Sequence, residues 1–195
     1  MKAYIKDQIK DSYETKQALY NNEILLEKIV EVAKKCINIY QNNKKTILAG
    51  NGGSAADAQH IAAELVGRYG FDRPSIPSLA LTTDTSNLTA IGNDYGYDQV
   101  FSRQLEGMGQ AGDIFIGIST SGNSQNIINA FESAKKKNIF TVALVGKDGG
   151  KMAQQADIAL VVPSTATPRI QETHILIGHI ICDIIEKELF GNGVA

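Results

Sequence analysis

The chain has 195 residues, of which 43% are hydrophobic and 21% charged, and this predicts one globular domain with a sizeable core. A net charge of −2 argues against nucleic acid as a ligand, because the one lysine run, 135–137, fits a helix C-terminus. No apolar run reaches membrane-spanning length and the first residues lack a signal-peptide core, so we expect a cytoplasmic protein without membrane contact.

The N-terminal region, residues 3–42, has apolar positions at three- and four-residue steps and contains neither glycine nor proline. This pattern predicts two helices that break near Asn21 and Asn22. Because they precede the first strand, we expect this helical extension to pack across the domain or against another subunit. Cys36 in this region and Cys182 near the C-terminus form no CxxC pair and are predicted to be free and buried.

A glycine-rich turn follows the first predicted strand, Thr46–Gly50, and leads into a helix predicted over Ser54–Tyr69. Such a turn lets backbone N–H groups approach an anion closely, and the helix adds the positive end of its dipole. Ser54 is expected at the N-cap, with Asp57 completing a capping-box-like pattern. The segment therefore predicts an anion site, with no nucleotide fingerprint.

His60 and Glu64 stand four residues apart on this helix and so project from one face. They lie about 9 and 15 Å along the axis from Ser54, a reach that suits a sugar phosphate whose reacting carbon is several bonds from its phosphate. The alternative is an ordinary surface pair, although the apolar residues around them favour burial.

Four further short apolar runs alternate with helical patterns, as expected for parallel strands buried on both faces. This rhythm predicts a three-layer αβα sandwich around a five-stranded parallel sheet of flavodoxin-like or Rossmann-like type. No linker divides the chain, so we expect one domain over 1–195. The predicted strands are Ser78–Leu81, Asp113–Ile118, Phe140–Val145 and Ile158–Val162, and the helices between them Thr85–Gly92, Tyr97–Gly107, Ser124–Lys137 and Gly150–Gln155.

A second anion-binding candidate, residues 118–124, follows the strand at 113–118 and opens a helix. Its hydroxyls, Gly122 and the helix N-terminus suit a phosphate, whereas the alternative is a hydroxyl-rich turn with a helix cap. In open α/β sheets ligands bind at the carboxyl ends of the strands, and two such loops there favour a monophosphate. Nucleotide binding is not expected, since the chain lacks a Walker A lysine and GxGxxG.

The final helix is predicted to begin at Thr167 as N-cap with Pro168 at the first helical position. Its apolar residues cover most of the circumference, which predicts a helix buried nearly all round and therefore a homo-oligomer. His179 lies in an apolar stretch, where a histidine is commonly a core residue. Gln171 and His179 are about 12 Å apart along the axis, so if both reach one centre they come from different protomers at a subunit interface.

Four stretches make the chain closely similar to the phosphoheptose isomerases, members of the sugar isomerase (SIS) domain family. The resemblance covers nearly the whole sequence; the serine loop is shared by SIS proteins generally, and the other three stretches indicate the heptose branch. The stretches are 50–60, 81–96, 119–124 and 169–174.

The resemblance implies conversion of sedoheptulose 7-phosphate to D-glycero-D-manno-heptose 7-phosphate, a step in making heptose for bacterial surface glycans such as lipopolysaccharide. It implies a homotetramer in the cytoplasm and one zinc ion per active site, held by His60, Glu64, Gln171 and His179. The substrate-binding residues that it implies are Asn51, Gly52, Gly53, Ser54, Glu64, Asn93, Asp94, Ser119, Thr120, Ser121, Ser124 and Gln171.

For the chemistry, we assign Glu64 as the base that moves a proton between adjacent carbons through an enediol(ate), and His179 as the acid. Zinc could polarise the carbonyl, although a carboxylate held by zinc is a weaker base. The strongest alternative is a non-catalytic SIS protein that binds sugar phosphates as an interaction or regulatory module. Such relatives lack the equivalents of Glu64 and His179, both of which are present here. An isomerase of another sugar phosphate is the second alternative.

Overall fold

The computed structural model describes residues 1–193, in which five parallel strands form one sheet in the order β2-β1-β3-β4-β5. Three of the strands, β1, β3 and β4, are buried along nearly their whole length, as their continuous apolar sequences predict. The predicted strands are confirmed to within one residue at either end. The strands are β1 (Thr46–Gly50), β2 (Ser78–Ala80), β3 (Ile114–Ser119), β4 (Phe140–Val145) and β5 (Ile158–Val161).

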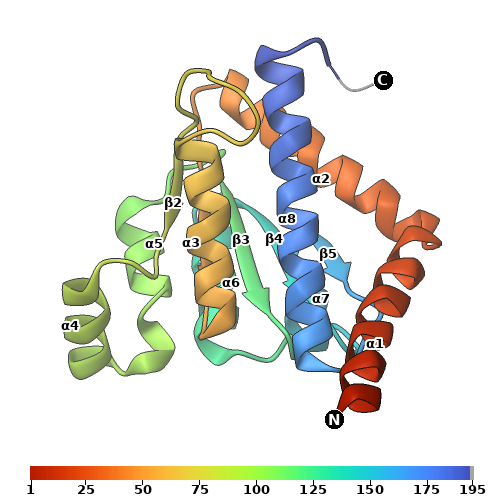
Figure 1. Ribbon diagram of the computed structural model, residues 1–195. Coiled ribbons are helices and arrows are strands. Elements are labelled where there is room, and N and C mark those ends of the chain that lie inside the picture. The colour runs from red at the N-terminus through yellow and green to blue at the C-terminus, as the bar shows by residue number, and fades with distance from the viewer. Residues whose placement is uncertain (194–195) are drawn as a thin grey trace.

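Helices cover both faces of the sheet and give the predicted three-layer architecture (Figure 1). The break at Asn21 and Asn22 is confirmed, whereas the single helix predicted over Tyr97–Gly107 is divided into a 3₁₀ turn and a short α-helix. The elements are α1 (Lys2–Tyr20), α2 (Glu23–Gln41), α3 (Gly53–Val66), α4 (Thr85–Tyr95), η1 (Tyr97–Gln99), α5 (Ser102–Met108), α6 (Gln125–Lys136), α7 (Gly150–Gln155) and α8 (Thr167–Phe190).

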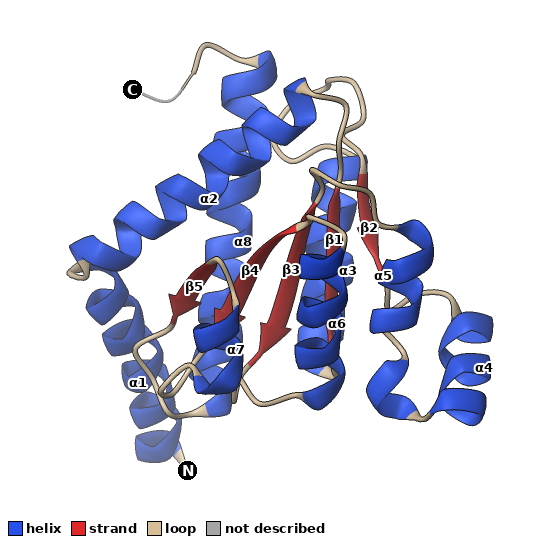
Figure 2. Cartoon of the chain, turned by 180° about the vertical axis from the view of Figure 1, so that it is seen from behind, coloured by secondary structure: helices blue, strands red, loops and turns tan. Residues whose placement is uncertain are grey.

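The two faces of the sheet bury separate hydrophobic clusters. On one face α2, α3 and α8 pack on alternate strand residues such as Leu48 and Ile116. On the other face, seen toward the viewer in Figure 2, α5, α6 and α7 pack on residues such as Phe115 and Val145. The period of two along each strand sends neighbouring side chains to opposite clusters, which is why α3 and α8 come to share one face.

The order of the strands places a switch point between β1 and β3. The strand β1 pairs with β2 on one side and with β3 on the other, and its last residue, Gly50, lies opposite Ile118. The loops that follow β1 and β3 therefore start side by side at the carboxyl edge of the sheet. In doubly wound folds this edge at the switch point is where ligands bind.

Two predicted helix starts are wrong. The helix α3 begins at Gly53 with Gly52 as N-cap, so Ser54 is not the cap and Asp57 makes no capping box. Gly52 has φ +56°, a conformation that glycine adopts without strain, and this turns the chain into the helix one residue earlier. Ser54 is buried instead. Similarly, Ala166 rather than Thr167 is the N-cap of α8, so Pro168 stands at the second helical position and not at the predicted first one, still within the first turn.

The helix α8 is not buried all round within this chain. Its buried residues lie on one face, from Ile170 to Glu186, whereas Ile180 is 38% exposed and Phe190 40% exposed. The apolar circumference was read correctly from the sequence, but a single sheet covers only one side of a helix. That another subunit buries the exposed side of α8 remains a prediction.

A buried ion pair fixes the segment after α3 to α8. The carboxylate of Glu186 accepts hydrogen bonds from the backbone N–H groups of Tyr69, Gly70 and Phe71 and from Nε of Arg73. Burial alone would raise the pKa of Glu186, but these donors outweigh it and lower the pKa. Arg73 also donates to the carbonyl oxygen of Glu64, at 2.8 Å. The end of α3 is thus held by a fully partnered charge pair.

The two cysteines are free and buried as predicted, and burial raises the pKa of each thiol to about 12. Both are therefore inert thiols of the core. Among residues 1–193, no helix is both long and apolar enough to cross a membrane.

His174, on α8, is completely buried, and burial lowers its pKa from 6.5 to about 4. Between these values the unfolded chain binds a proton at this position and the folded chain does not. Stability should therefore fall as the pH drops from 6.5 toward 4, by about 3 kcal/mol for this group. Urea unfolding of the wild type and of His174→Asn across pH 4–8 measures the difference, and parallel pH curves for the two proteins would contradict the expectation.

Candidate functional site

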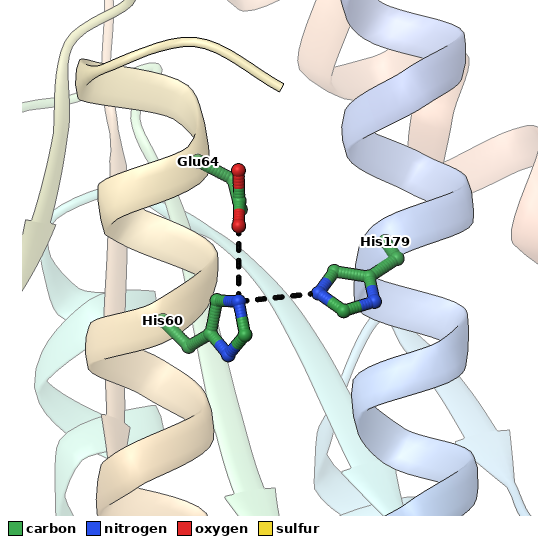
Figure 3. Close-up of side chains that lie close together, drawn as sticks. All are labelled: His60, Glu64 and His179. Carbon is green, nitrogen blue, oxygen red and sulfur yellow. Dashed lines mark hydrogen bonds and ion pairs between the residues drawn. The ribbon is translucent and has the colours of Figure 1, made fainter. Parts of the chain in front are cut away.

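Three side chains from α3 and α8 converge above one face of the sheet. His60 Nε2 lies 2.9 Å from Glu64 Oε1 and 3.3 Å from His179 Nε2, and the two imidazole rings meet edge to face at 4.9 Å between centroids. Figure 3 shows all three pointing toward one another across the space between the helices. The side chain of His60 is 49% exposed and that of Glu64 24% exposed. His60 and Glu64 are thus part of a three-residue cluster and not an isolated surface pair. His179 is partly exposed in this cluster and is not a core residue.

The geometry of this cluster fits a metal cation. One ligand atom from each of the three residues lies within 4.8 Å of the others. Tetrahedral zinc with Zn–N and Zn–O bonds of about 2.0–2.1 Å needs ligand atoms about 3.3 Å apart. The distances from His60 Nε2 to Glu64 Oε1 and to His179 Nε2, 2.9 and 3.3 Å, are close to this value. Two imidazole nitrogens and a carboxylate oxygen facing one point also repel one another unless a proton or a cation lies between them. Imidazole and carboxylate are ligands that zinc accepts.

A glycine makes the convergence sterically possible. A Cβ atom at Gly178 would lie 2.6 Å from Cδ1 of Ile61, so α8 packs against α3 at a distance that only glycine allows. Gly178 is followed directly by His179, and Ile61 directly follows His60. The close contact therefore sets the separation of the two imidazole rings.

Gln171 does not join the cluster within this chain. Its side-chain amide lies against Gly53, where a Cβ atom would be 2.4 Å from Nε2. Because Gly53 precedes His60 by seven residues, the amide lies about 10 Å along α3 from the level of the imidazole. Of the four residues expected around one zinc ion, three therefore form the cluster within a single chain. The fourth, Gln171, lies beside the glycine-rich turn.

The two predicted anion loops lie next to each other at the carboxyl edge of β1 and β3. Gly52 and Gly53 are exposed, and Ser54 is buried in the first turn of α3. On the second loop the hydroxyl of Ser119 lies 2.8 Å from that of Ser124 and 3.4 Å from that of Ser121. A cluster of hydroxyls at the start of α6, beside the start of α3, offers donors for a phosphate from two helix N-termini. Thr120 is half-buried in the same loop.

Asn93 and Asp94 lie in α4, at the far edge of the fold beyond β2 (Figure 1). Both are exposed, and the Asn93 amide donates to the Asp94 carboxylate at 2.8 Å. Within residues 85–95, all of which the structure describes, no side chain is buried. The structure therefore brings these two residues together but does not place them against the cluster on α3 and α8.

The sequence analysis did not place two residues near the cluster: Tyr69 was only the predicted end of a helix, and Asp57 was assigned only to capping. Tyr69 has its ring 5.8 Å from that of His179, and burial raises the pKa of its hydroxyl. Asp57 lies one turn before His60; burial raises its pKa to about 6, against the attraction of His60, and its Oδ2 atom has no partner among residues 1–193. The spacing of Asp57 from His60 and Glu64 was the available signal, since 57, 60 and 64 share a helical face.

Three comparisons with known proteins agree on the family that the chain resembles. The family model described as the SIS domain matches residues 12–146. The chain is 81% identical to the phosphoheptose isomerase of Sulfurimonas denitrificans over 194 residues, covering all of both chains, and 61% identical to that of Aneurinibacillus thermoaerophilus, covering 98% and 97%. Among solved structures, the phosphoheptose isomerase of Neisseria gonorrhoeae is similar, with a TM-score of 0.90, 46% identity and coverage of 95% and 98%.

A methyl group at Gly178 tests whether helix packing sets the cluster. In Gly178→Ala the new Cβ would meet Ile61, so α8 should move away from α3, and zinc affinity should fall at least about tenfold. Competition with a chelator measures the affinity. Gly107→Ala is the control, because a Cβ there meets nothing within 4 Å, and a second substitution, Ile61→Ala, should restore binding. Unchanged zinc affinity in Gly178→Ala would show that the contact does not control the site.

Proposed function

The chain belongs to the SIS domain family and, within it, to the phosphoheptose isomerases, and we propose that the cluster on α3 and α8 carries out the isomerisation. The family's reaction converts sedoheptulose 7-phosphate to D-glycero-D-manno-heptose 7-phosphate, in heptose biosynthesis for bacterial surface glycans. The observation that supports this assignment most is that His179 of α8 meets His60 and Glu64 of α3, the helix whose N-terminus follows the first anion loop. One helix thereby offers a phosphate site and a proton-transfer site.

Substrate binding is assigned to the two loops. The N–H groups around Asn51, Gly52 and Gly53, with Ser54, face one side of the phosphate, and the hydroxyl loop faces the other. The sugar then extends along α3 toward His60 and Glu64. We include in the substrate-binding set Asn93, Asp94, Ser119, Thr120, Ser121, Ser124 and Gln171, together with Glu64.

In the reaction, the Glu64 carboxylate removes a proton from C1 of the ketose, and the electron pair forms the C1–C2 double bond of the enediol(ate). His179 supplies the proton for O2 and accepts the one that leaves O1. Glu64 then returns its proton to C2, which gives the aldose. No atom is gained or lost overall, as an isomerisation requires.

A zinc ion held by His60, Glu64, His179 and Gln171 would polarise the carbonyl group and lower the energy of the developing negative charge. These donors fit zinc, and we assign one ion per active site and no nucleotide cofactor. Because Glu64 would be both a zinc ligand and the base in this scheme, its carboxylate would be a weaker base while it binds the ion.

Oligomer formation completes the proposal. We assign a homotetramer in the cytoplasm, in which the whole chain, 1–195, is one SIS domain and residues 1–42 pack against other subunits. Gln171 would then reach the cluster of a neighbouring protomer. Large apolar side chains on α1, α2 and α8 are exposed in the single chain, and this supports such contacts. They are Ile5, Ile9, Tyr13, Ile24, Val30 and Ile180.

Glu64→Gln keeps the size of the side chain and removes the proton acceptor. We expect turnover of sedoheptulose 7-phosphate to fall at least about a hundredfold in the zinc-supplied protein. The appearance of the aldoheptose phosphate measures it. Turnover close to the wild-type value would refute Glu64 as the base, and a wild-type protein inert on sedoheptulose, ribulose and fructose phosphates would favour the non-catalytic binding module.

Subunit mixing tests the origin of Gln171. Glu64→Gln and Gln171→Ala subunits are each expected to be inactive, but if Gln171 serves a neighbour, hybrids of the two contain sites in which both residues are wild type. Activity should therefore appear when the variants are co-expressed with different tags and the hybrid is purified. A hybrid as inactive as its parents would place Gln171 and Glu64 of one chain in the same site.

A further inference from the structure

A buried amide pair joins the two anion loops. Asn126 lies in the first turn of α6 and is 3% exposed. Its Nδ2 donates to Oδ1 of Asn51 at 2.9 Å, and Nδ2 of Asn51 donates back to Oδ1 of Asn126 at 2.9 Å. The two side chains thus form a closed pair of hydrogen bonds between the loop after β1 and the helix after β3. Sequence analysis did not identify Asn126, because the pair joins positions 75 residues apart.

A third segment is tied to the same pair. The hydroxyl of Tyr97, in η1, donates to Oδ1 of Asn51 at 3.1 Å. On the next turn of α6, the amide of Asn129 donates to the carbonyl oxygen of Asp98 at 2.9 Å. The turn η1 directly follows α4, which carries Asn93 and Asp94. The start of α6 is therefore linked by side-chain hydrogen bonds to the loop after β1, which carries assigned substrate-binding residues, and to η1, which directly follows the helix that carries Asn93 and Asp94.

The position of Asn126 gives it control over loop geometry. It lies two residues after Ser124, the N-cap of α6 and a member of the hydroxyl cluster. Asn51 precedes Gly52, whose backbone has φ +56° and ψ −121° and turns the chain into α3. Glycine is conformationally permissive, so Gly52 does not by itself fix the path of the loop that it shares with Asn51. Hydrogen bonds from outside the loop to the side chain of Asn51 supply that restraint. A reciprocal amide pair in a buried setting does this with both partners satisfied.

We propose that Asn126 is a positioning residue for phosphate binding, which acts through Asn51 by fixing the spacing between the two anion loops. The inference rests on the proposed function, because it takes the two loops to hold the phosphate of the substrate. Asn126 itself is too buried to touch the ligand. It sets the direction of the backbone N–H groups at Gly52 and Gly53 relative to the hydroxyls of the second loop.

The test compares KM and kcat in Asn126→Ala, Asn51→Ala and the double variant. Asn126→Ala should raise KM for sedoheptulose 7-phosphate about tenfold and change kcat far less, since the reacting groups lie two turns away on α3. If Asn126 acts through Asn51, it should have no further effect in the Asn51→Ala background. Ser133→Ala is the control: Ser133 is equally buried on α6, but its hydroxyl donates to Glu106 on α5, so KM should stay at the wild-type value.

Three outcomes would overturn the proposal: an unchanged KM in Asn126→Ala, a rise that is matched by Ser133→Ala, or effects of Asn126→Ala and Asn51→Ala on KM that simply add. A wild-type protein without turnover would refute the proposed function instead. In that case calorimetric binding of sedoheptulose 7-phosphate replaces KM in the same comparison. Weaker binding by Asn126→Ala than by the wild type and Ser133→Ala would then support the positioning role, and equal binding would refute it.

Discussion

The site depends on the close packing of two helices that run in the same direction, α3 and α8. Gly178 allows the contact with Ile61, and the residues beside these two, His179 and His60, meet as a result. The same pair of helices is joined at both ends. Gln171 lies against the first turn of α3, and the carboxylate of Glu186 holds the segment that follows its last turn. A helix fixed at three levels can hold two imidazoles and a carboxylate in place with little reorganisation, which is what a metal or a proton-transfer site requires.

The helix α3 separates two kinds of chemistry along its length. Its N-terminus, next to that of α6 at the switch point, presents N–H groups and a positive dipole end, which attract a phosphate. Two turns further on, His60 and Glu64 present groups that accept protons or bind a cation. A phosphate held at one end, as we propose, would leave the rest of an extended sugar to lie along the helix. The reacting carbons are then positioned by binding energy from a remote group that takes no part in the bond changes.

Local patterns predicted most of the fold and two of the three residues of the cluster. Buried strands and amphipathic helices follow from periods of two and 3.6, and the pair His60 and Glu64 follows from a spacing of four. The partner His179 could not be paired with them from spacing, because its place depends on Gly178 and on the sheet order that puts α8 beside α3. The buried pair Asn51 and Asn126 lay beyond sequence reasoning for the same reason. The N-cap assignment at Ser54 failed because the N-cap is Gly52, two residues earlier, where the chain turns into the helix.

Exposure of the cluster and exposure of α8 have one physical origin. The side chain of His60 is 49% exposed, and Ile180, the residue after His179, is 38% exposed. Both lie on the side of the helix pair that faces away from the sheet. An enediolate exposed to bulk water exchanges protons with the solvent and is stabilised less by the fixed dipoles of the protein. An isomerase therefore needs the exposed side of this helix pair to be closed during turnover. A second subunit seated on α8 would bury the apolar residues that the sequence places there and cover the cluster in the same contact. The apolar circumference of α8 and the role proposed for His179 are in this view two requirements met by one surface, which would account for a histidine of the cluster in the middle of an apolar helix.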